Sequence, residues 1–307
     1  MRFFYLIVCI STIISMQSTI TAFSFKKIYN YVLPTKLHQE VVYEEYNPKK
    51  ITHFSLKNIQ GNITITSDSK TDKIFLKATK KAPEPELLNQ LTFTHTIKGQ
   101  EFSINTAFND INGFIDFEII VPHSIALNVS TQEGTVTIKD PQAPTQANTQ
   151  KGSITINNAK SSIHATTHIK GTIILNNCQG PITAQTNSGT IIINDAHSNV
   201  VAQTNNGSIQ MFAREISSTS TIKLATVSGS ILLHLPPDTN ADLQAYTKQG
   251  TITSDHFITL KPQTTQLNRT AWKRLQKQVD GILGSGEAHI TLSSVKSDIK
   301  LLEMKTT

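Results

Sequence analysis

Acidic side chains that could work in pairs are scarce in the middle of this 307-residue sequence. Glycosidases need two carboxyl groups on one face, and polysaccharide lyases need a carboxylate-bound calcium ion beside a strong base. The stretch from Pro141 to Asn194 contains no Asp or Glu. Asp140, Asp195 and Glu215 flank it at positions that favour turns over an acid and base pair. We therefore expect no catalytic residue. A carbohydrate-active β-helix enzyme ranks third among the possible functions, after a binding protein and a structural scaffold.

Two histidines and one cysteine are the other candidates for chemistry. His164 and His168 would share one strand face, and two imidazoles at that spacing could hold a metal ion, but no third ligand stands nearby. His168 takes the place of a repeated threonine, which favours a structural role. Cys178 has no catalytic His motif beside it, so we expect a packed thiol. No phosphate loop, HExxH or Gly-x-Ser-x-Gly pattern occurs, and we expect neither a metal nor a cofactor.

A repeat with a period near 18 residues organises the chain. The pattern Gly, then Ser or Thr, then Ile or Val recurs at Gly134, Gly152, Gly171, Gly189, Gly207, Gly229 and Gly250. A threonine precedes most of these glycines by three residues, with His168 as the exception. Each unit reads as two short strands with period-two alternation, such as Ile182-Thr-Ala-Gln-Thr186 and Gly189-Thr-Ile-Ile-Ile193. Two such strands bury little alone, so the units must stack.

Stacking of successive units would align like residues from coil to coil. Small Ala165, Ala184 and Ala202 would face larger Ile173, Ile191 and Ile209 across a narrow core. Asn pairs follow successive second strands and could form a side-chain ladder. The predicted fold is an all-β, single-stranded β-solenoid, or β-helix, with coils of about 18 to 22 residues. It has a strand-rich N-terminal cap and one short helix near the C-terminus.

Outside the repeats the chain stays rich in alternating segments. The exception is Gln266 to Leu283, where Leu267, Ala271, Leu275 and Val279 fall at helical spacing. The sequence therefore divides into a signal peptide at 1–22, an N-terminal extension at 23–50, an N-terminal β region or cap at 51–123, regular solenoid repeats at 124–260, a helical insert at 261–284 and C-terminal strands or cap at 285–307.

Outward-facing apolar residues offer a candidate binding surface. Thr155, Ile174, Ile192, Gln210 and Leu232 lie between two core positions of the second strands and would form a column on the outside. Ile174 and Ile192 would then give an apolar stripe that needs covering. The helix around Trp272 or the N-terminal strands could pack on it. Alternatively, Ile174, Ile192, Leu232 and Trp272 form a surface for a partner or ligand.

The N-terminus has the pattern of a secretory signal. Arg2 precedes an apolar run that extends to Met16, and Ala22 offers a small residue for cleavage before Phe23, although an uncleaved anchor stays open. No later segment has the roughly 20 apolar residues of a membrane span. Removing Arg2 leaves 27 Lys and Arg against 22 Asp and Glu. The basic residues lack the interleaved aromatic side chains of a nucleic-acid platform, so we expect no nucleic-acid partner.

The motifs and their order resemble the bacterial putative-adhesin family of domains of unknown function, the LiaG-like β-strand-repeat proteins. The resemblance rests on Phe117 to Pro122 leading into Leu127 to Ile138, on the Gly-Ser/Thr-Ile units, and on Gly284 to Leu292 followed by Ser297-Asp-Ile299. It covers roughly residues 40 to 302. Ser297 stands where the family has a glycine. The family implies an exported β-solenoid with a presumed adhesive role, and it supplies no catalytic residues.

We therefore expect an exported, non-enzymatic β-solenoid with an adhesin-like role, in the periplasm, at the cell surface or secreted. Its partner would be an unknown envelope or surface polymer or protein, and self-association stays possible. The first alternative is a self-assembling structural scaffold of the cell envelope, because open coil ends invite pairing from edge to edge.

Overall fold

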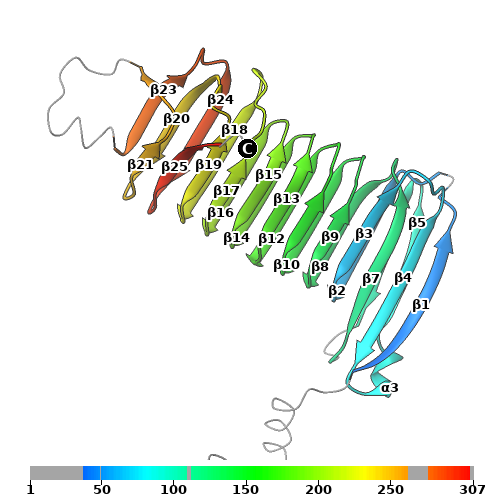
Figure 1. Ribbon diagram of the computed structural model, residues 1–307. Helices are drawn as coiled ribbons and strands as arrows, with labels where there is room; N and C mark the ends of the chain where they lie inside the picture. Colours follow the sequence, from blue (N-terminus) through cyan, green and yellow to red (C-terminus); the bar gives the residue numbers. More distant parts are fainter. Residues whose placement is uncertain (1–36, 49, 109–111, 262–275, 305–307) are drawn as a thin grey trace, which may run out of the picture.

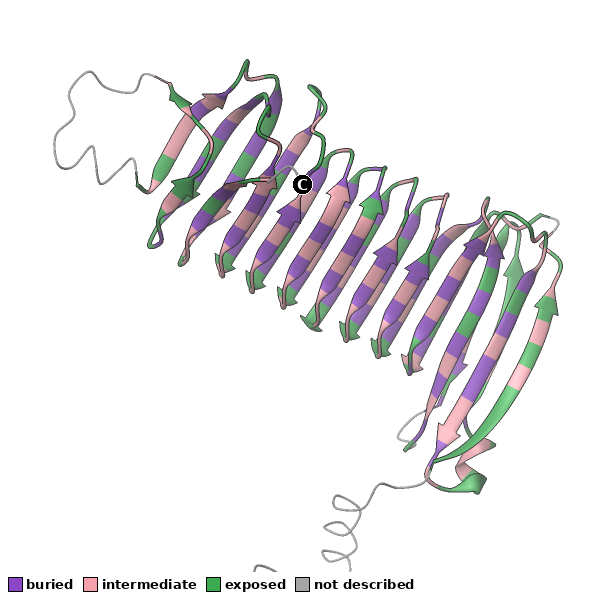
Figure 2. Ribbon diagram, viewed as in Figure 1, coloured by how far each residue is buried: buried purple, intermediate pink, exposed green. Residues whose placement is uncertain are grey.

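Two long sheets of parallel strands make up most of the protein (Figure 1). The computed structural model describes residues 37–48, 50–108, 112–261 and 276–304. Sheet A has 12 strands and sheet B has 13, and their inward side chains form one continuous core. Buried positions alternate with more exposed ones along the strands of the central coils (Figure 2). The predicted β-solenoid is confirmed.

Six central coils follow the repeat. Each coil runs through one strand of sheet B and then one strand of sheet A, and each strand pairs in parallel with its equivalents in the adjacent coils. The coils are β8 (Ala126–Glu133) with β9 (Val136–Lys139), β10 (Thr145–Lys151) with β11 (Ile154–Asn157), β12 (Ile163–Lys170) with β13 (Ile173–Cys178), β14 (Ile182–Ser188) with β15 (Ile191–Ala196), β16 (Val200–Asn206) with β17 (Ile209–Phe212), and β18 (Thr221–Ser228) with β19 (Ile231–Leu235).

The narrow core is filled as the alternation predicts. Ala165, Ala184 and Ala202 pair side by side in sheet B and are fully buried. Ile173, Ile191 and Ile209 form the matching buried column in sheet A. Alanine in one sheet and isoleucine in the other keep the volume between the sheets nearly constant from coil to coil.

A column of glycines marks the corner between the two strands of each coil. A Cβ placed on Gly189 would lie 2.0 Å from the carbonyl oxygen of Gly171, and the other repeat glycines up to Gly229 are equally close to the glycine of the adjacent coil. Gly189 also has a φ of +151°, which other residues rarely adopt. The buried Thr204 hydroxyl donates a hydrogen bond to the Gly189 carbonyl at 3.2 Å. The repeated Thr and Gly are therefore parts of one corner.

Stacked asparagines form the predicted ladder at the opposite corner. The Asn176 side chain donates to Asn157 and accepts from Asn194, both at 2.7 Å. In the next column Asn158 donates to Asp140 at 2.8 Å. Asp140, Asn158, Asn177 and Asp195 all have positive φ angles, from 52° to 64°. These residues combine a tolerated left-handed turn with a polar contact between coils.

The stacking order departs from the sequence order at the C-terminal end. The expectation that every Gly unit lies on its predecessor is wrong for the last unit: β20 (Ala241–Thr247) and β21 (Ile252–Ser254) do not pair with β18 and β19. The coil of β24 (Ala288–Ser294) and β25 (Ile299–Glu303) lies between them. Its corner residue is Ser297, and a Cβ on Gly250 would lie 2.2 Å from the Ser297 carbonyl oxygen.

The helix predicted at the C-terminus is wrong where it can be compared. β23 (Gln278–Leu283) is a strand that pairs antiparallel with β20 and with β22 (Thr259–Leu260). Pairing places Val279, Gly281 and Leu283 opposite inward residues of β20, so a period of two outweighs the helical spacing. The rest of the expected helix, at 262–275, lies outside the described residues.

The N-terminal end is also out of order. The coil of β2 (His53–Gln60) and β3 (Ile63–Asp68) lies against β8 and β9, and the coil of β6 (Glu101–Ala107) and β7 (Phe114–Pro122) lies outside it. Antiparallel strands continue the sheets beyond these coils. They are β1 (His38–Tyr46) and β4 (Ile74–Ala82) in sheet A and β5 (Thr92–Lys98) in sheet B, with the short helix α3 (Pro85–Leu88) after β4. The sequence placed β1 in an extension, which is wrong because β1 is the edge strand of sheet A.

Candidate functional site

The structure places the predicted outward residues in one row on the outer face of sheet A. Thr155, Ile174, Ile192, Gln210 and Leu232 are direct neighbours in five successive strands. All five side chains are partly exposed, and each shields the next. Gln210 interrupts the apolar row between Ile192 and Leu232. Whether the row binds a partner stays a prediction.

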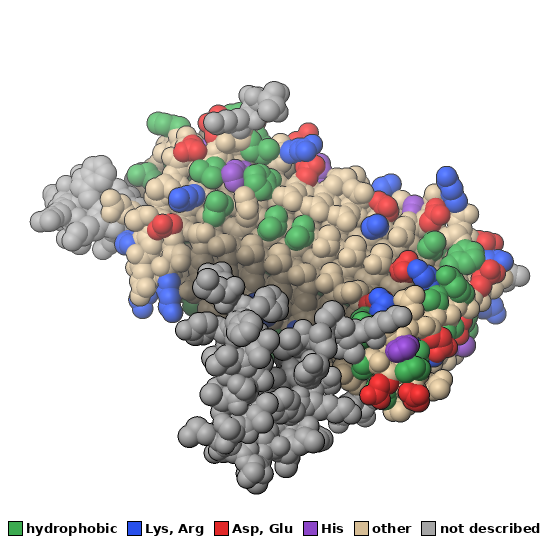
Figure 3. Space-filling view, turned by 60° about the horizontal axis from the view of Figure 1, so that its bottom comes forward, with side chains coloured by type: hydrophobic (Ala, Val, Ile, Leu, Met, Phe, Trp, Pro, Cys, Tyr) green, Lys and Arg blue, Asp and Glu red, His purple; other side chains and the backbone are tan. Residues whose placement is uncertain are grey.

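An adjacent row widens this apolar surface. Phe212 and His234 are neighbours in β17 and β19, and their rings stack with centroids 4.1 Å apart at an angle of 14°. Burial lowers the pKa of His234, which favours a neutral ring in the stack. We call Ile174, Ile192, Phe212 and Leu232 the central stripe. Figure 3 shows hydrophobic side chains around a histidine in the C-terminal half of the molecule, at the upper left.

The N-terminal strands do not cover the central stripe. They continue the sheets past β9 and β8 instead of folding back over β13 and β15 (Figure 1). The other covering element that the sequence offered was the helix around Trp272. Trp272 lies outside the described residues, so its place in the candidate surface stays a prediction.

A second apolar surface, which the sequence reasoning missed, lies on the same face at the N-terminal end. Tyr43 of β1 is 73% exposed, Phe75 of β4 39% and Ile120 of β7 41%. They line an open groove of about 660 Å³ together with Lys77 and Glu118. We call these five residues the N-terminal groove. Figure 3 shows hydrophobic side chains among charged ones at this end, on the right.

The signal that could have identified the groove was present in the sequence. A strand with one buried face alternates apolar and polar residues, so an apolar residue in the middle of an apolar triplet points outward. Ile74-Phe75-Leu76 and Ile119-Ile120-Val121 are such triplets, as is Ile173-Ile174-Leu175 in the repeats. The first two triplets lie outside the repeats, where no periodic copy draws attention to the outward position.

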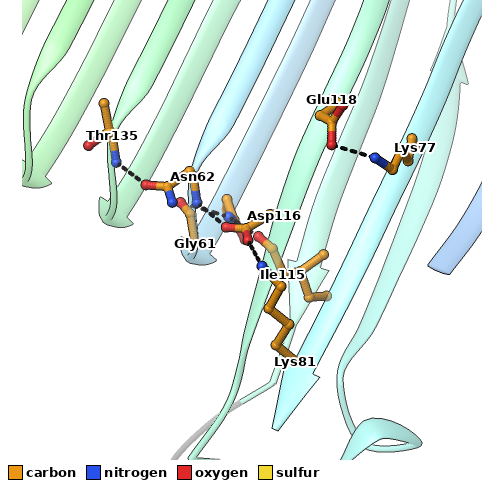
Figure 4. A network of polar contacts seen from close by, with 9 residues as sticks. Gly61, Asn62, Lys77, Lys81, Ile115, Asp116, Glu118 and Thr135 are labelled. Carbon is orange, nitrogen blue, oxygen red and sulfur yellow. Dashed lines mark hydrogen bonds and ion pairs between the residues drawn. The ribbon is translucent and has the colours of Figure 1, made fainter. Parts of the chain in front are cut away.

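Polar contacts hold the strands of the N-terminal groove in register (Figure 4). Lys77 and Glu118 form an ion pair of 2.6 Å across β4 and β7, and this hydrogen bond raises the pKa of Lys77. Asp116 accepts from Lys81 at 2.9 Å and from the backbone N–H of Asn62 at 2.8 Å. The Asn62 side chain accepts from the backbone N–H of Thr135 at 2.9 Å. The groove is thus tied to the first regular coil.

The acidic residues around the central coils lie in turns, as predicted. Asp140 and Asp195 belong to the same turn column, with Asn158 and Asn177 between them. Three steps of about 4.8 Å separate them by roughly 14 Å. Paired carboxyl groups of glycosidases are at most about 9.5 Å apart. Glu215 lies in the loop after β17, beside Arg214 and His197 in a polar hollow of about 390 Å³.

His164 and His168 are both exposed on the outer face of sheet B. The expectation that His168 fills the threonine position is wrong: Thr167 pairs with Thr149 and Thr186, and a register shift follows it. The extra residue of this coil is absorbed as a bulge. Among the described residues, no group of three or more His, Cys, Asp or Glu side chains could hold a metal ion.

Cys178 is fully buried at the end of β13. Burial raises the pKa of its thiol to about 11, so the nucleophilic thiolate is disfavoured at neutral pH. Its sulfur is 3.6 Å from the carbonyl oxygen of Asn176. This is the packed thiol that the sequence indicated.

No helix in the described part of the chain has the length and apolar character to cross a membrane.

Comparison with known proteins gives one family. The sequence model of the family described as Toastrack DUF4097 matches residues 38–302. The sequence matches no curated protein.

Three crystal structures are similar to this chain at low identity. A putative cell adhesion protein from Clostridium sporogenes is 12% identical, with a TM-score of 0.30, over 88% of this chain and 100% of that one. A putative adhesin from Bacteroides fragilis is 14% identical, with a TM-score of 0.39, over 86% and 97%. A putative lipid binding protein from Parabacteroides distasonis is 11% identical, with a TM-score of 0.33, over 87% and 97%.

Proposed function

The chain belongs to the family described as Toastrack DUF4097, and we propose that it is an exported, non-enzymatic binding protein with an adhesin-like role. Its target is a component of the cell envelope or of an external surface. The signal pattern before Phe23 supports export. The match also agrees with the family of unknown function that the repeats resemble.

One observation carries this proposal: the outer face of sheet A presents apolar side chains at two places without a covering element among the described residues. The central stripe consists of partly exposed apolar side chains, interrupted by Gln210, with one aromatic stack. The N-terminal groove adds a largely exposed tyrosine beside an ion pair. Contiguous exposed apolar surface on a folded protein commonly marks an interaction site, and exposed tyrosines are frequent anchors in interfaces.

The arrangement of reactive groups supports binding over catalysis. Asp140 and Asp195 are three coils apart, and Cys178 is buried with a raised pKa. Within the described part of the chain, the outer face of sheet A therefore offers contact area and hydrogen bonds, but no nucleophile beside a general base.

The central stripe can be tested with charged substitutions. Ile174→Lys and Ile192→Lys should lower the binding of labelled protein to intact bacterial cells and purified peptidoglycan at least tenfold, while the thermal unfolding temperature stays unchanged. Thr155→Lys, in the same row but outside the stripe, is the matched control and should bind like the wild type. Unchanged binding in both isoleucine variants, or lost stability instead of lost binding, would contradict a binding role for the stripe.

Export has its own measurement. Cell fractionation followed by intact mass should find the protein outside the cytoplasm with an N-terminus near Phe23. A cytoplasmic chain that keeps Met1 would rule out this part of the proposal without touching the binding surface.

The scaffold alternative rests on the open ends of the sheets. Sheet A ends with the nine-residue β1 at one end and the three-residue β21 at the other. Edges of such different length give little continuous pairing from head to tail, so we expect a stable monomer. Filaments that grow with concentration in size-exclusion chromatography would favour the scaffold.

A further inference from the structure

The edge strand β1 is the most open of the four sheet edges. β1 pairs with β4 over His38 to Tyr46 without a register shift, and its other side has no neighbour among the described strands. The C-terminal edges, β21 and β22, have only three and two residues. Natural proteins usually protect long edges with prolines, lysines, bulges or a covering element. β1 has no proline, lysine or bulge, and the described helix that contacts it, α3, has only four residues.

The side chains of β1 suit an added strand. Val41 is 39% exposed and Tyr43 is 73% exposed, and both point to the outer face of sheet A. A strand placed beside β1 would cover part of each side chain and would pair with the free backbone groups of the edge. Addition of an extended segment to a sheet edge is a common mode of peptide recognition.

Charge indicates what kind of segment fits. β1 carries Glu40, Glu44 and Glu45 and no lysine or arginine. Lysines of the neighbouring strand pair with these glutamates. The Nζ of Lys80 in β4 lies 3.4 Å from a carboxylate oxygen of Glu40, and the Nζ of Lys73, just before β4, lies 2.5 Å from one of Glu45. Both glutamates stay about half exposed, so they can also meet cations on the free side.

We propose that the free edge of β1 docks an extended, basic polypeptide segment as an additional strand of sheet A. The segment would have β-forming residues with lysine or arginine near Glu40 and Glu45. A second copy of the chain fits less well, because β1 beside β1 would bring glutamates together. The other N-terminal edge, β5, has the sequence Thr-Phe-Thr-His-Thr-Ile-Lys without an acidic residue.

This site is separate from the proposed function, which uses the outer face and a surface component. The docking edge uses backbone groups of β1 and shares only Tyr43 with the N-terminal groove, so its failure would leave the central stripe and the other four groove residues untouched. The two proposals can therefore fail independently.

A synthetic peptide provides the test. The segment from Lys73 to Ala82 is the sequence that β1 already accepts as a neighbour, so it serves as the probe with a fluorescent label. Added to the full-length protein, it should give saturable fluorescence anisotropy. Val41→Lys and Tyr43→Lys should weaken binding at least tenfold. Ile97→Lys is the matched control, because Ile97 is 59% exposed on β5 and the variant gains the same charge; it should change binding less than twofold.

Three results would overturn the proposal. The first is equal binding of a probe in which two residues are replaced by proline, because proline has no backbone N–H to donate to the edge. The second is loss of binding in Phe75→Lys as large as in Val41→Lys, which would place the probe in the N-terminal groove. The third is a protein dimer in sedimentation that Val41→Lys dissociates, which would assign the edge to a second copy.

Hydrogen exchange gives a reading that needs no variant. The probe should slow the exchange of alternate β1 amides in the wild-type protein and leave those of β5 unchanged. Equal protection of both strands, or of neither, would also overturn the proposal.

Discussion

The central coils and the N-terminal end use the same two sheets in different ways. From β8 to β19 every strand lies between parallel neighbours with equivalent residues, and Gly, Thr, Ala and Ile each form columns. At the N-terminal end β1, β4 and β5 are antiparallel, and the core there is built from Phe54, Phe102 and Phe117. In the coils, the residue type at a position is set by the equivalent residue one coil away, because the two lie side by side. At the N-terminal end, the residue type at a position is set by contacts with strands that are distant in the sequence.

The two regions also differ in how far their residues can vary and in the binding features that they present. The corners of the central coils leave no room for variation, because a Cβ on a repeat glycine would collide with the previous carbonyl. The N-terminal end has no such columns on its outer face, and there the exposed tyrosine, the ion pair and the open edge occur together. The N-terminal groove and the docking edge therefore lie where the repetition stops, whereas the central stripe lies on the repeated strands.

The corner glycines should show the largest contrast between the two regions. Gly189→Ala places its Cβ 2.0 Å from the Gly171 carbonyl, and we expect a loss of at least about 4 kcal/mol in the free energy of unfolding. Gly99→Ala, in the hairpin between β5 and β6, meets no atom within 4 Å and should lose about 1 to 2 kcal/mol from its φ of +60°. Chemical denaturation measures both. Similar losses would mean that the glycine column is not a steric requirement.

Overpacking of the coil core should have the next largest effect. Ala184 is fully buried between Ala165 and Ala202, so Ala184→Phe should lose about 1 to 3 kcal/mol. Its sequence neighbour Thr183 points outward from the same strand, and Thr183→Phe should stay within about 0.5 kcal/mol of the wild type. Denaturant unfolding compares the two variants. Wild-type stability in Ala184→Phe would show that the two sheets can separate locally.

Polar contacts should give the smallest effects, again with a difference between the regions. Asn176→Ala breaks two hydrogen bonds of the ladder and should lose about 1 kcal/mol. Lys77→Ala breaks an exposed ion pair at the N-terminal end and should shift the denaturation midpoint less than Asn176→Ala does. Denaturation in about 0.5 M salt is the control, because salt should remove the Lys77 effect and spare the Asn176 effect. The reverse order would show that the end depends on its ion pairs more than the coils depend on their ladder.

The sequence predicted the central coils closely because their rules are local. The period, the Ala and Ile columns, the Asn ladder and the turn positions of Asp140 and Asp195 all follow from a pattern repeated within 18 or 19 residues. The outward row of Ile174 and Ile192 follows from the same register. Once the strands of one coil are predicted correctly, the repeat gives the strands of the adjacent coils.

The errors lie where local pattern and tertiary pairing disagree. The spacing of Leu275 and Val279 suggests a helix, but β23 pairs with β20 from Gln278 onward. The one-residue bulge after Thr167 cannot be located from a step of 19 residues, because the extra residue fits on either side of the corner. Antiparallel pairing of strands between residues 38 and 122 brings Tyr43, Phe75 and Ile120 together. No repeat in the sequence predicts this pairing.

The exchanged order of the last two coils has a consequence for synthesis. The coil of β24 and β25 contains residues made after β20 and β21, yet it occupies the place next to β18 and β19. On a ribosome, residues 241 to 254 emerge 47 residues before their only parallel partners, and until then β20 can pair only with the antiparallel strand β23. A chain interrupted before Ala288 would leave two unfinished surfaces at once, which makes an incomplete product easy for proteases to recognise and remove.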